Sequence, residues 1–173
     1  MGEHFFWITS RAAGISALLA SSAAVALGLL MAGRMIKGNK DLRIWHEAFS
    51  IATMVSLVVH AFALLGDSYL KPSLIDLLVP GFIDYQTFWT ALGIVGGWLF
   101  VILGLTYYIR GRIGPQRWRT LHRFTALAWG LGVIHSLGAG TDADTAWFLI
   151  AAAMVVIPGV ALLIRRMTPE LAA

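Results

Sequence analysis

The sequence predicts an all-α integral membrane protein, a bundle of five membrane-spanning helices in a single domain over residues 1–173. Hydrophobic residues make up 58% of the chain and charged residues 13%, against about 45–50% and about 25% in soluble domains. Five apolar segments each approach the roughly 20 residues that a helix needs to cross a bilayer. Such a chain has too few polar side chains to cover its surface in water, so it belongs in lipid.

The expected spans follow one another without an internal repeat or a second module. They lie at residues 12–33, 44–65, 87–109, 121–137 and 146–164. Between the second and third spans, an apolar stretch at 74–79 is flanked by Pro72 and Pro80. Because this stretch is too short to cross the membrane, we expect a short helix lying on its surface.

Basic residues gather on one side of the expected membrane. Of the thirteen Lys and Arg residues, all but Arg11 and Lys71 flank the connections after the first and third spans or follow the fifth. The positive-inside rule assigns that side to the cytoplasm. The N-terminus is therefore expected outside and the C-terminus in the cytoplasm, with the second and fourth spans parallel. This distribution also accounts for the basic composition without a nucleic-acid partner.

Four of the five histidines lie in two of the spans, where ionisable residues are rare and usually functional. His46 and His60 are fourteen residues apart in the second span, and His122 and His135 are thirteen apart in the fourth. Neutral imidazole is a good axial ligand for haem iron. Parallel spans pair first with first, so we predict two b-type haems, an inner one on His46 and His122 and an outer one on His60 and His135.

The thirteen-residue spacing fits less simply than the fourteen-residue one. In an ideal helix, fourteen residues return to within about 40° of the same face, but thirteen end about 140° away. Helix tilt, a π-bulge or a distortion near Gly130 and Gly132 is expected to correct this mismatch.

The four histidines also have interpretations without haem. They can form interhelical hydrogen bonds, bind zinc, or relay protons or ions. His4 is expected to be an ordinary surface residue.

The chain contains no cysteine, which excludes thiolate haem ligation, iron–sulfur clusters and cysteine zinc sites.

The segment Arg117-Trp118-Arg119-Thr120-Leu121-His122-Arg123, followed by His135, resembles the Arg-Trp-x-x-Leu-His-Arg segment of the ferric-reductase-like transmembrane domain. That superfamily includes NADPH oxidases, ferric reductases and the haem-bearing subunit of the bacterial methionine sulfoxide reductase system. The resemblance implies two haems on two helices with spacings of fourteen and thirteen. It is greatest for small actinobacterial members, on Arg11, Gly14 and residues 138–142, and it implies a bacterial plasma membrane.

Two axial histidines leave haem iron no open position, which favours electron transfer. Since cytoplasmic reductants are the usual donors, we expect electrons to pass from the inner haem to the outer haem and on to an acceptor at the outer face. NADPH oxidases have six membrane helices and a flavin and nicotinamide domain, whereas five spans and no Gly-rich dinucleotide fingerprint are found here. The expected donor is therefore a separate flavoprotein reductase or a quinol. Ferric iron, oxygen, a quinone and a periplasmic protein are all candidate acceptors. The sequence also leaves open whether the chain is itself an oxidoreductase or the membrane subunit of one. A b561-like quinol-coupled di-haem cytochrome is the alternative.

Two arginines are candidates to bind the anionic haem propionates. We expect Arg123, next to His122, to hold those of the inner haem and Arg11, near the outer end of the first span, those of the outer haem. Otherwise both residues serve as topology signals or extend to lipid headgroups.

Three further side chains have candidate roles beside the histidines. Glu47 can hydrogen-bond a ligand imidazole or accept a proton from a quinol, but an ion pair with Arg43, four residues earlier, is the favoured interpretation. Trp98 and Trp129 can fill the space between two haems, but ordinary core or lipid-facing packing is the favoured interpretation for both.

Overall fold

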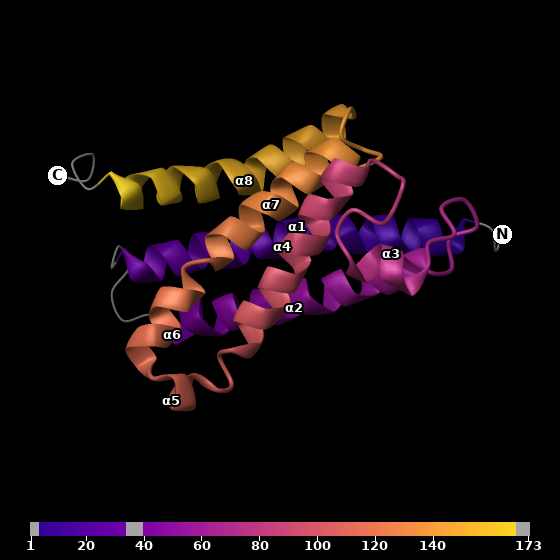
Figure 1. Cartoon of the computed structure of the whole chain (residues 1–173). Coiled ribbons are helices and arrows are strands. Elements are labelled where there is room, and N and C mark those ends of the chain that lie inside the picture. The colour runs from indigo at the N-terminus through magenta and orange to yellow at the C-terminus, as the bar shows by residue number, and fades with distance from the viewer. Residues whose placement is uncertain (1–3, 34–39, 169–173) are drawn as a thin grey trace.

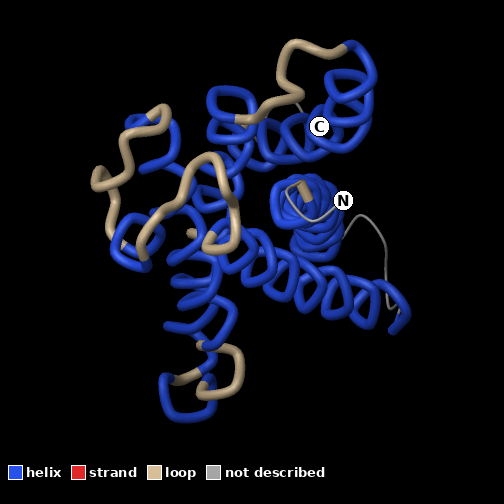
Figure 2. Tube along the Cα trace, turned by 90° about the vertical axis from the view of Figure 1, so that its right-hand side faces the viewer, coloured by secondary structure: helices blue, strands red, loops and turns tan. Residues whose placement is uncertain are grey.

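The computed structural model describes residues 4–33 and 40–168. These residues form helices and connecting loops, without a strand (Figure 1, Figure 2). In chain order the helices are α1 (Phe5–Ala32), α2 (Lys40–Leu64), α3 (Leu74–Leu78), α4 (Thr87–Leu105), α5 (Arg110–Ile113), α6 (Pro115–His122), α7 (Thr125–Ala139) and α8 (Ala146–Met167). The all-α prediction is therefore confirmed over the described part of the chain.

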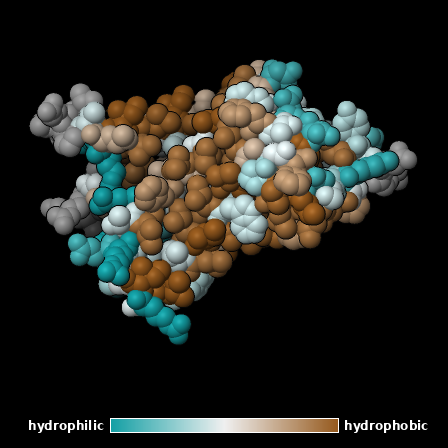
Figure 3. Space-filling model, in the orientation of Figure 1, coloured by the Kyte–Doolittle hydropathy of each residue, from teal (hydrophilic) through white to brown (hydrophobic). Residues whose placement is uncertain are grey.

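Four helices, α1, α2, α4 and α8, are long and apolar enough to cross a membrane. Hydrophobic side chains form a broad band around the middle of the molecule, and polar side chains gather toward its ends (Figure 3). A band of this kind matches the hydrocarbon core of a bilayer. The chain is thus a multi-pass membrane protein.

The fourth expected span, at 121–137, is divided in the structure. α6 ends at His122, and α7 begins at Thr125 and has 15 residues, fewer than the roughly 17 that a span needs at least. At the junction, the backbone N–H groups of Arg123 and Phe124 donate to carbonyls three residues earlier, the bonding of a 3₁₀ turn. The break lies there, whereas Gly130 and Gly132 lie within continuous α7.

Small side chains let the helices approach α1 closely. α1 packs against α2, α7 and α8, and its buried residues are mostly alanine and serine. Small residues at such contacts permit the close van der Waals packing that holds membrane helices together. Trp129 of α7 is 3% exposed and donates its indole N–H to the Ser22 hydroxyl of α1 at 2.9 Å. α1 is therefore the helix against which α2, α7 and α8 pack.

The two ends of the bundle differ in charge. We call the end with the start of α1 the acidic end, where Asp67, Asp84, Asp142 and Asp144 lie in the connections. The opposite, basic end includes Arg43, Arg110, Arg112, Arg117, Arg119, Arg165 and Arg166, whereas Arg34 and Lys37 lie outside the described residues. The two ends are well separated in Figure 1, and the charge rule predicts that the acidic end is the outer one.

The short helix expected at 74–79 is present as α3. Ser73 caps it: its hydroxyl accepts from the Asp76 N–H, and the Asp76 carboxylate accepts from the Ser73 N–H, a capping box. The indole of Trp98 in α4 donates to the Leu78 carbonyl at 2.9 Å. This bond attaches the end of α3 to the bundle.

Candidate functional site

The four histidines of the second and fourth expected spans form two facing pairs. The ring centroids of His46 and His122 are 6.2 Å apart with the rings at 81°. Those of His60 and His135 are 6.3 Å apart at 68°. α2 thus supplies one imidazole to each pair, and α6 and α7 supply the others, at two levels of the bundle.

These distances suit two imidazoles on opposite sides of one metal ion. A metal–nitrogen bond of about 2.0 Å plus roughly 1.1–1.2 Å from nitrogen to ring centroid puts two such centroids about 6.2–6.4 Å apart. Ordinary aromatic pairs also lie about 4.5–7 Å apart, so the distance does not by itself single out a metal. The hydrogen bonds on the far side of three of the four rings favour a metal ion.

Three of the imidazoles are held through Nδ1 by a backbone carbonyl. The acceptors are Ala24 O for His46 at 2.8 Å, Ser10 O for His60 at 2.8 Å and Trp89 O for His135 at 3.0 Å. Because a carbonyl can only accept, Nδ1 carries the proton in each ring. Nε2 is then the unprotonated nitrogen, and a backbone acceptor on the other nitrogen is the usual support for a metal-binding histidine.

A glycine lies behind each of these three rings, four residues after the accepting carbonyl. A Cβ on Gly14 would come within 3.0 Å of His60, one on Gly28 within 3.2 Å of His46, and one on Gly93 within 2.6 Å of His135. The missing side chains let each ring reach the helix backbone. Gly14 and Gly28 are fourteen residues apart, as are His60 and His46 on antiparallel α2, so one contact is repeated at both levels.

His122 lacks this arrangement. Thirteen residues after Gly93 comes Thr106, the residue directly after α4, which has a side chain. Nδ1 of His122 is buried without a hydrogen-bond partner among the described residues. Its ring stacks instead on the indole of Trp118, with centroids 4.9 Å apart at 25°. His122 is therefore held by stacking, where the other three are held by hydrogen bonds.

The turn between α6 and α7 accounts for much of the awkward thirteen-residue spacing. Residues in a 3₁₀ turn advance about 120° and 2.0 Å each, against about 100° and 1.5 Å in an α-helix. Three such residues reduce the mismatch between His122 and His135 from about 140° to about 80°, and raise their separation to about 21 Å. That rise equals the one expected for the fourteen residues between His46 and His60.

A cavity of about 490 Å³ opens beside the His60–His135 pair at the acidic end. Its volume lies in the range of cofactor sites, about 300–1,000 Å³. Helices α1, α2, α4 and α7 contribute most of its lining, which is largely apolar and includes Gly14 and Gly93. Its charged lining residues, Arg11, Asp67 and Asp142, lie at the acidic end of the bundle.

The arrangement suits a flat ligand with a metal centre better than a bare ion. Among the described residues, no three His, Asp or Glu side chains converge on one point. Protein zinc sites take three or four such ligands, whereas haem supplies four equatorial nitrogens and needs two axial ones. Two facing imidazoles at each level, with an apolar cavity beside one of them, fit haem.

The two arginine candidates differ in their partners. Arg11 lines the cavity, but its guanidinium forms a bidentate ion pair with Asp142. The Asp142 side chain is 8% exposed, so the pair fastens the start of α1 to the connection after α7. Arg123 is exposed, and within the described ranges its guanidinium forms no hydrogen bond or ion pair. The propionate roles of both residues stay predictions.

The expected ion pair between Glu47 and Arg43 is wrong. Arg43 donates instead to the Tyr107 hydroxyl at 3.4 Å, and the carboxylate of Glu47 lies beyond ion-pair distance of it. Tyr107 follows the end of α4 beside the start of α2 and offers Arg43 an acceptor there. Glu47 is exposed at the basic end.

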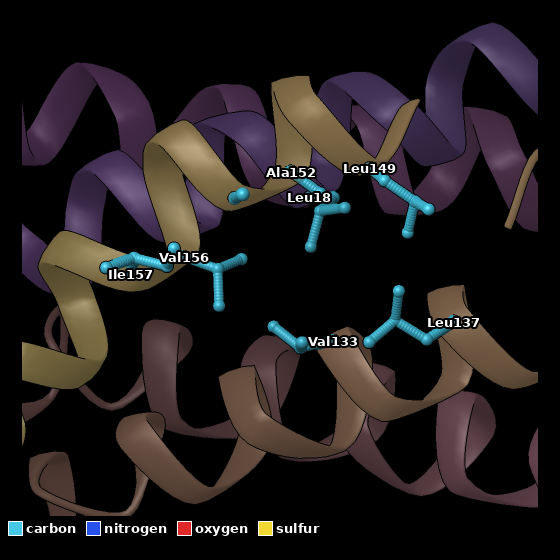
Figure 4. A pocket seen from close by; sticks show the side chains of 8 residues that line it. Leu18, Val133, Leu137, Leu149, Ala152, Val156 and Ile157 are labelled. Carbon is cyan, nitrogen blue, oxygen red and sulfur yellow. The ribbon is translucent and has the colours of Figure 1, made fainter. Parts of the chain in front are cut away.

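Trp98 and Trp129 both line the cavity, but they differ in burial. Trp129 is a core residue, bonded to Ser22 and packed over Gly159 of α8, whereas Trp98 is 44% exposed. A second cleft of about 200 Å³ lies between α1, α7 and α8 (Figure 4). Its lining side chains are all hydrocarbon, so it has no group that could orient a polar ligand.

No protein-family model matches the chain, and neither a characterised protein nor a solved structure matches it. The functional assignment therefore depends on the geometry above and on the motif around His122.

Proposed function

We propose that the protein transfers electrons across a bacterial plasma membrane through two bis-histidine b-type haems. His46 and His122 hold the inner one, and His60 and His135 the outer one. The observation that carries this proposal is the pair of facing imidazole couples, three of whose rings have Nδ1 bound to a carbonyl. Haem supplies a one-electron carrier, and two axial histidines leave its iron no open position, which favours electron transfer.

The residues of the chain have separate tasks in this scheme. The carbonyls of Ala24, Ser10 and Trp89 fix which imidazole nitrogen faces the ligand, and the apolar lining deeper in the cavity keeps water from the ligand. α6 and α7 together form the fourth expected span, because the 3₁₀ turn joins them end to end. With α1, α2, α4 and α8 they make five crossings. The donor is a cytoplasmic flavoprotein or a quinol, as the resemblance to ferric-reductase-like domains implies.

Proteoliposomes test the proposal directly. The haem-replete protein is reconstituted into the membrane of vesicles that contain ferricyanide, and dithionite is added to the outside solution. We expect fast reduction of the trapped ferricyanide, and we expect His60→Ala and His122→Ala each to abolish it although the two residues lie at opposite levels. His4→Ala, a change at an exposed residue of α1's N-terminal end, is the control and keeps full activity. A colourless protein with pH-dependent proton flux would instead identify a histidine relay.

A further inference from the structure

One buried carboxylate at the acidic end has no role in holding the histidines. Asp67 follows α2 and is 4% exposed. Its Oδ1 accepts from the backbone N–H of Tyr69 at 3.0 Å. Its Oδ2 is buried and has no hydrogen-bond partner in the described part of the chain. Asp67 lines the same cavity as His60 and His135.

The other charges of that cavity cancel. The titratable or charged groups in its lining, besides Asp67, are Arg11, His60, Tyr69, Tyr85, His135 and Asp142. Arg11 and Asp142 form an ion pair, and the lining residues of α3, α4 and α8 carry no titratable group. Lys71 donates only its backbone N–H to the Asp67 carbonyl. Among the described lining residues, ionised Asp67 thus has no counter-charge.

A buried carboxylate without a counter-charge is costly, and it becomes neutral by binding a proton when no positive charge is near. Ferric iron between two neutral imidazoles in a porphyrin has one net positive charge, not counting the propionates, and ferrous iron has none. Reduction at the outer pair therefore removes the positive charge that best balances ionised Asp67. The cavity then favours the protonated acid.

We propose that Asp67 is a redox-linked proton site, which binds a proton from the outer aqueous side when the iron between His60 and His135 is reduced and releases it on reoxidation. In this step the carboxylate gains an O–H bond, the iron goes from ferric to ferrous, the electron comes from the inner haem, and water at the acidic end supplies the proton. The inference rests on the proposed function.

Redox titration of the purified, haem-loaded full chain between pH 5.5 and 8.5 tests it. We expect one of two midpoint potentials to fall with rising pH by up to about 59 mV per pH unit, the slope for one proton per electron. In Asp67→Asn that component loses its slope and the other is unchanged. Asp84→Asn, at an exposed aspartate of the connection between α3 and α4, keeps the wild-type slope, and so does Asp67→Glu.

Infrared difference spectra give a second reading of the same site. The reduced-minus-oxidised spectrum should contain a protonated-carboxyl band that Asp67→Asn lacks. Two pH-independent potentials in the wild type, or a slope that persists in Asp67→Asn, would overturn the inference and leave the proposed function intact. A purified chain without haem would overturn both.

Discussion

Replacing Gly93 with alanine tests how α4 supports His135. The new Cβ would lie 2.6 Å from the Cγ and Nδ1 atoms of His135 and 2.8 Å from Cδ2. Non-bonded carbon atoms prefer separations of about 3.5–4.0 Å, so the ring or the helix must move by about 1 Å. Either movement disturbs the 3.0 Å bond from Nδ1 to the Trp89 carbonyl and turns Nε2 away from His60.

The expected cost is a small sum of opposing effects. Overpacking of this kind costs about 1–3 kcal/mol, and loss of the hydrogen bond about 0.5–1.5 kcal/mol. Alanine regains up to about 1 kcal/mol over glycine in a helix. The free energy of unfolding of the variant should therefore fall by about 0.5–3.5 kcal/mol, and the outer pair should lose its haem.

Haem content per chain and thermal unfolding in detergent measure both effects. Gly130→Ala in α7 is the control, because its Cβ would meet nothing within 4 Å and the residue lines neither cavity. Gly93→Ala should bind about one haem fewer than the wild type and unfold at a lower temperature, and Gly130→Ala should match the wild type in haem content. A Gly93→Ala protein with full haem content and an unchanged spectrum would refute this account of the packing.

Three further changes probe the bundle. Trp129→Phe removes the indole hydrogen bond to the Ser22 hydroxyl and should lower the free energy of unfolding by about 1 kcal/mol. In the Trp129→Phe/Ser22→Ala double variant, the loss of unfolding free energy should be much smaller than the sum of the two single losses. Arg11→Ala leaves Asp142, only 8% exposed, without its cation; thermal unfolding should occur earlier than in the wild type, and Arg11→Ala/Asp142→Asn should recover part of the loss. The hydroxyl and then the backbone N–H of Ser73 lower the pKa of Asp76. The ionised Asp76 carboxylate should thus stabilise α3 fully at pH values above the ordinary aspartate pKa, and this stabilisation should disappear as pH falls through the lowered pKa. Amide hydrogen exchange of α3 measured against pH should show the loss, and Ser73→Ala should weaken the pH dependence.

The sequence predicted much of the fold because apolar length determines where a helix can cross a membrane. The spans at 44–65 and 146–164 agree closely with α2 and α8, and the stretch at 74–79 with α3. α1 begins earlier than expected, at Phe5, because Arg11 lies inside the helix and is compensated by Asp142. The division near Arg123 was not predictable, since neither proline nor glycine marks it.

The site was predictable in its residue types but not in its supports. Histidine spacing and parallel spans suffice to suggest which imidazoles face each other. The carbonyl acceptors on α1 and α4 were not foreseen, because a backbone atom leaves no mark on the sequence. The fourteen-residue interval between Gly14 and Gly28, equal to that between His46 and His60, was the one signal that could have revealed them. Asp67 resembled any other loop aspartate until its burial was known.

Haem stoichiometry of the purified protein tests the central claim most directly. Chains produced in haem-replete cells, quantified by pyridine haemochrome against protein concentration, should contain about two b-type haems each. The ferric protein should give low-spin spectra, because both axial positions are taken by imidazole. A chain that purifies colourless from such cells, or that keeps both haems when His60 and His122 are replaced by alanine, would contradict the account.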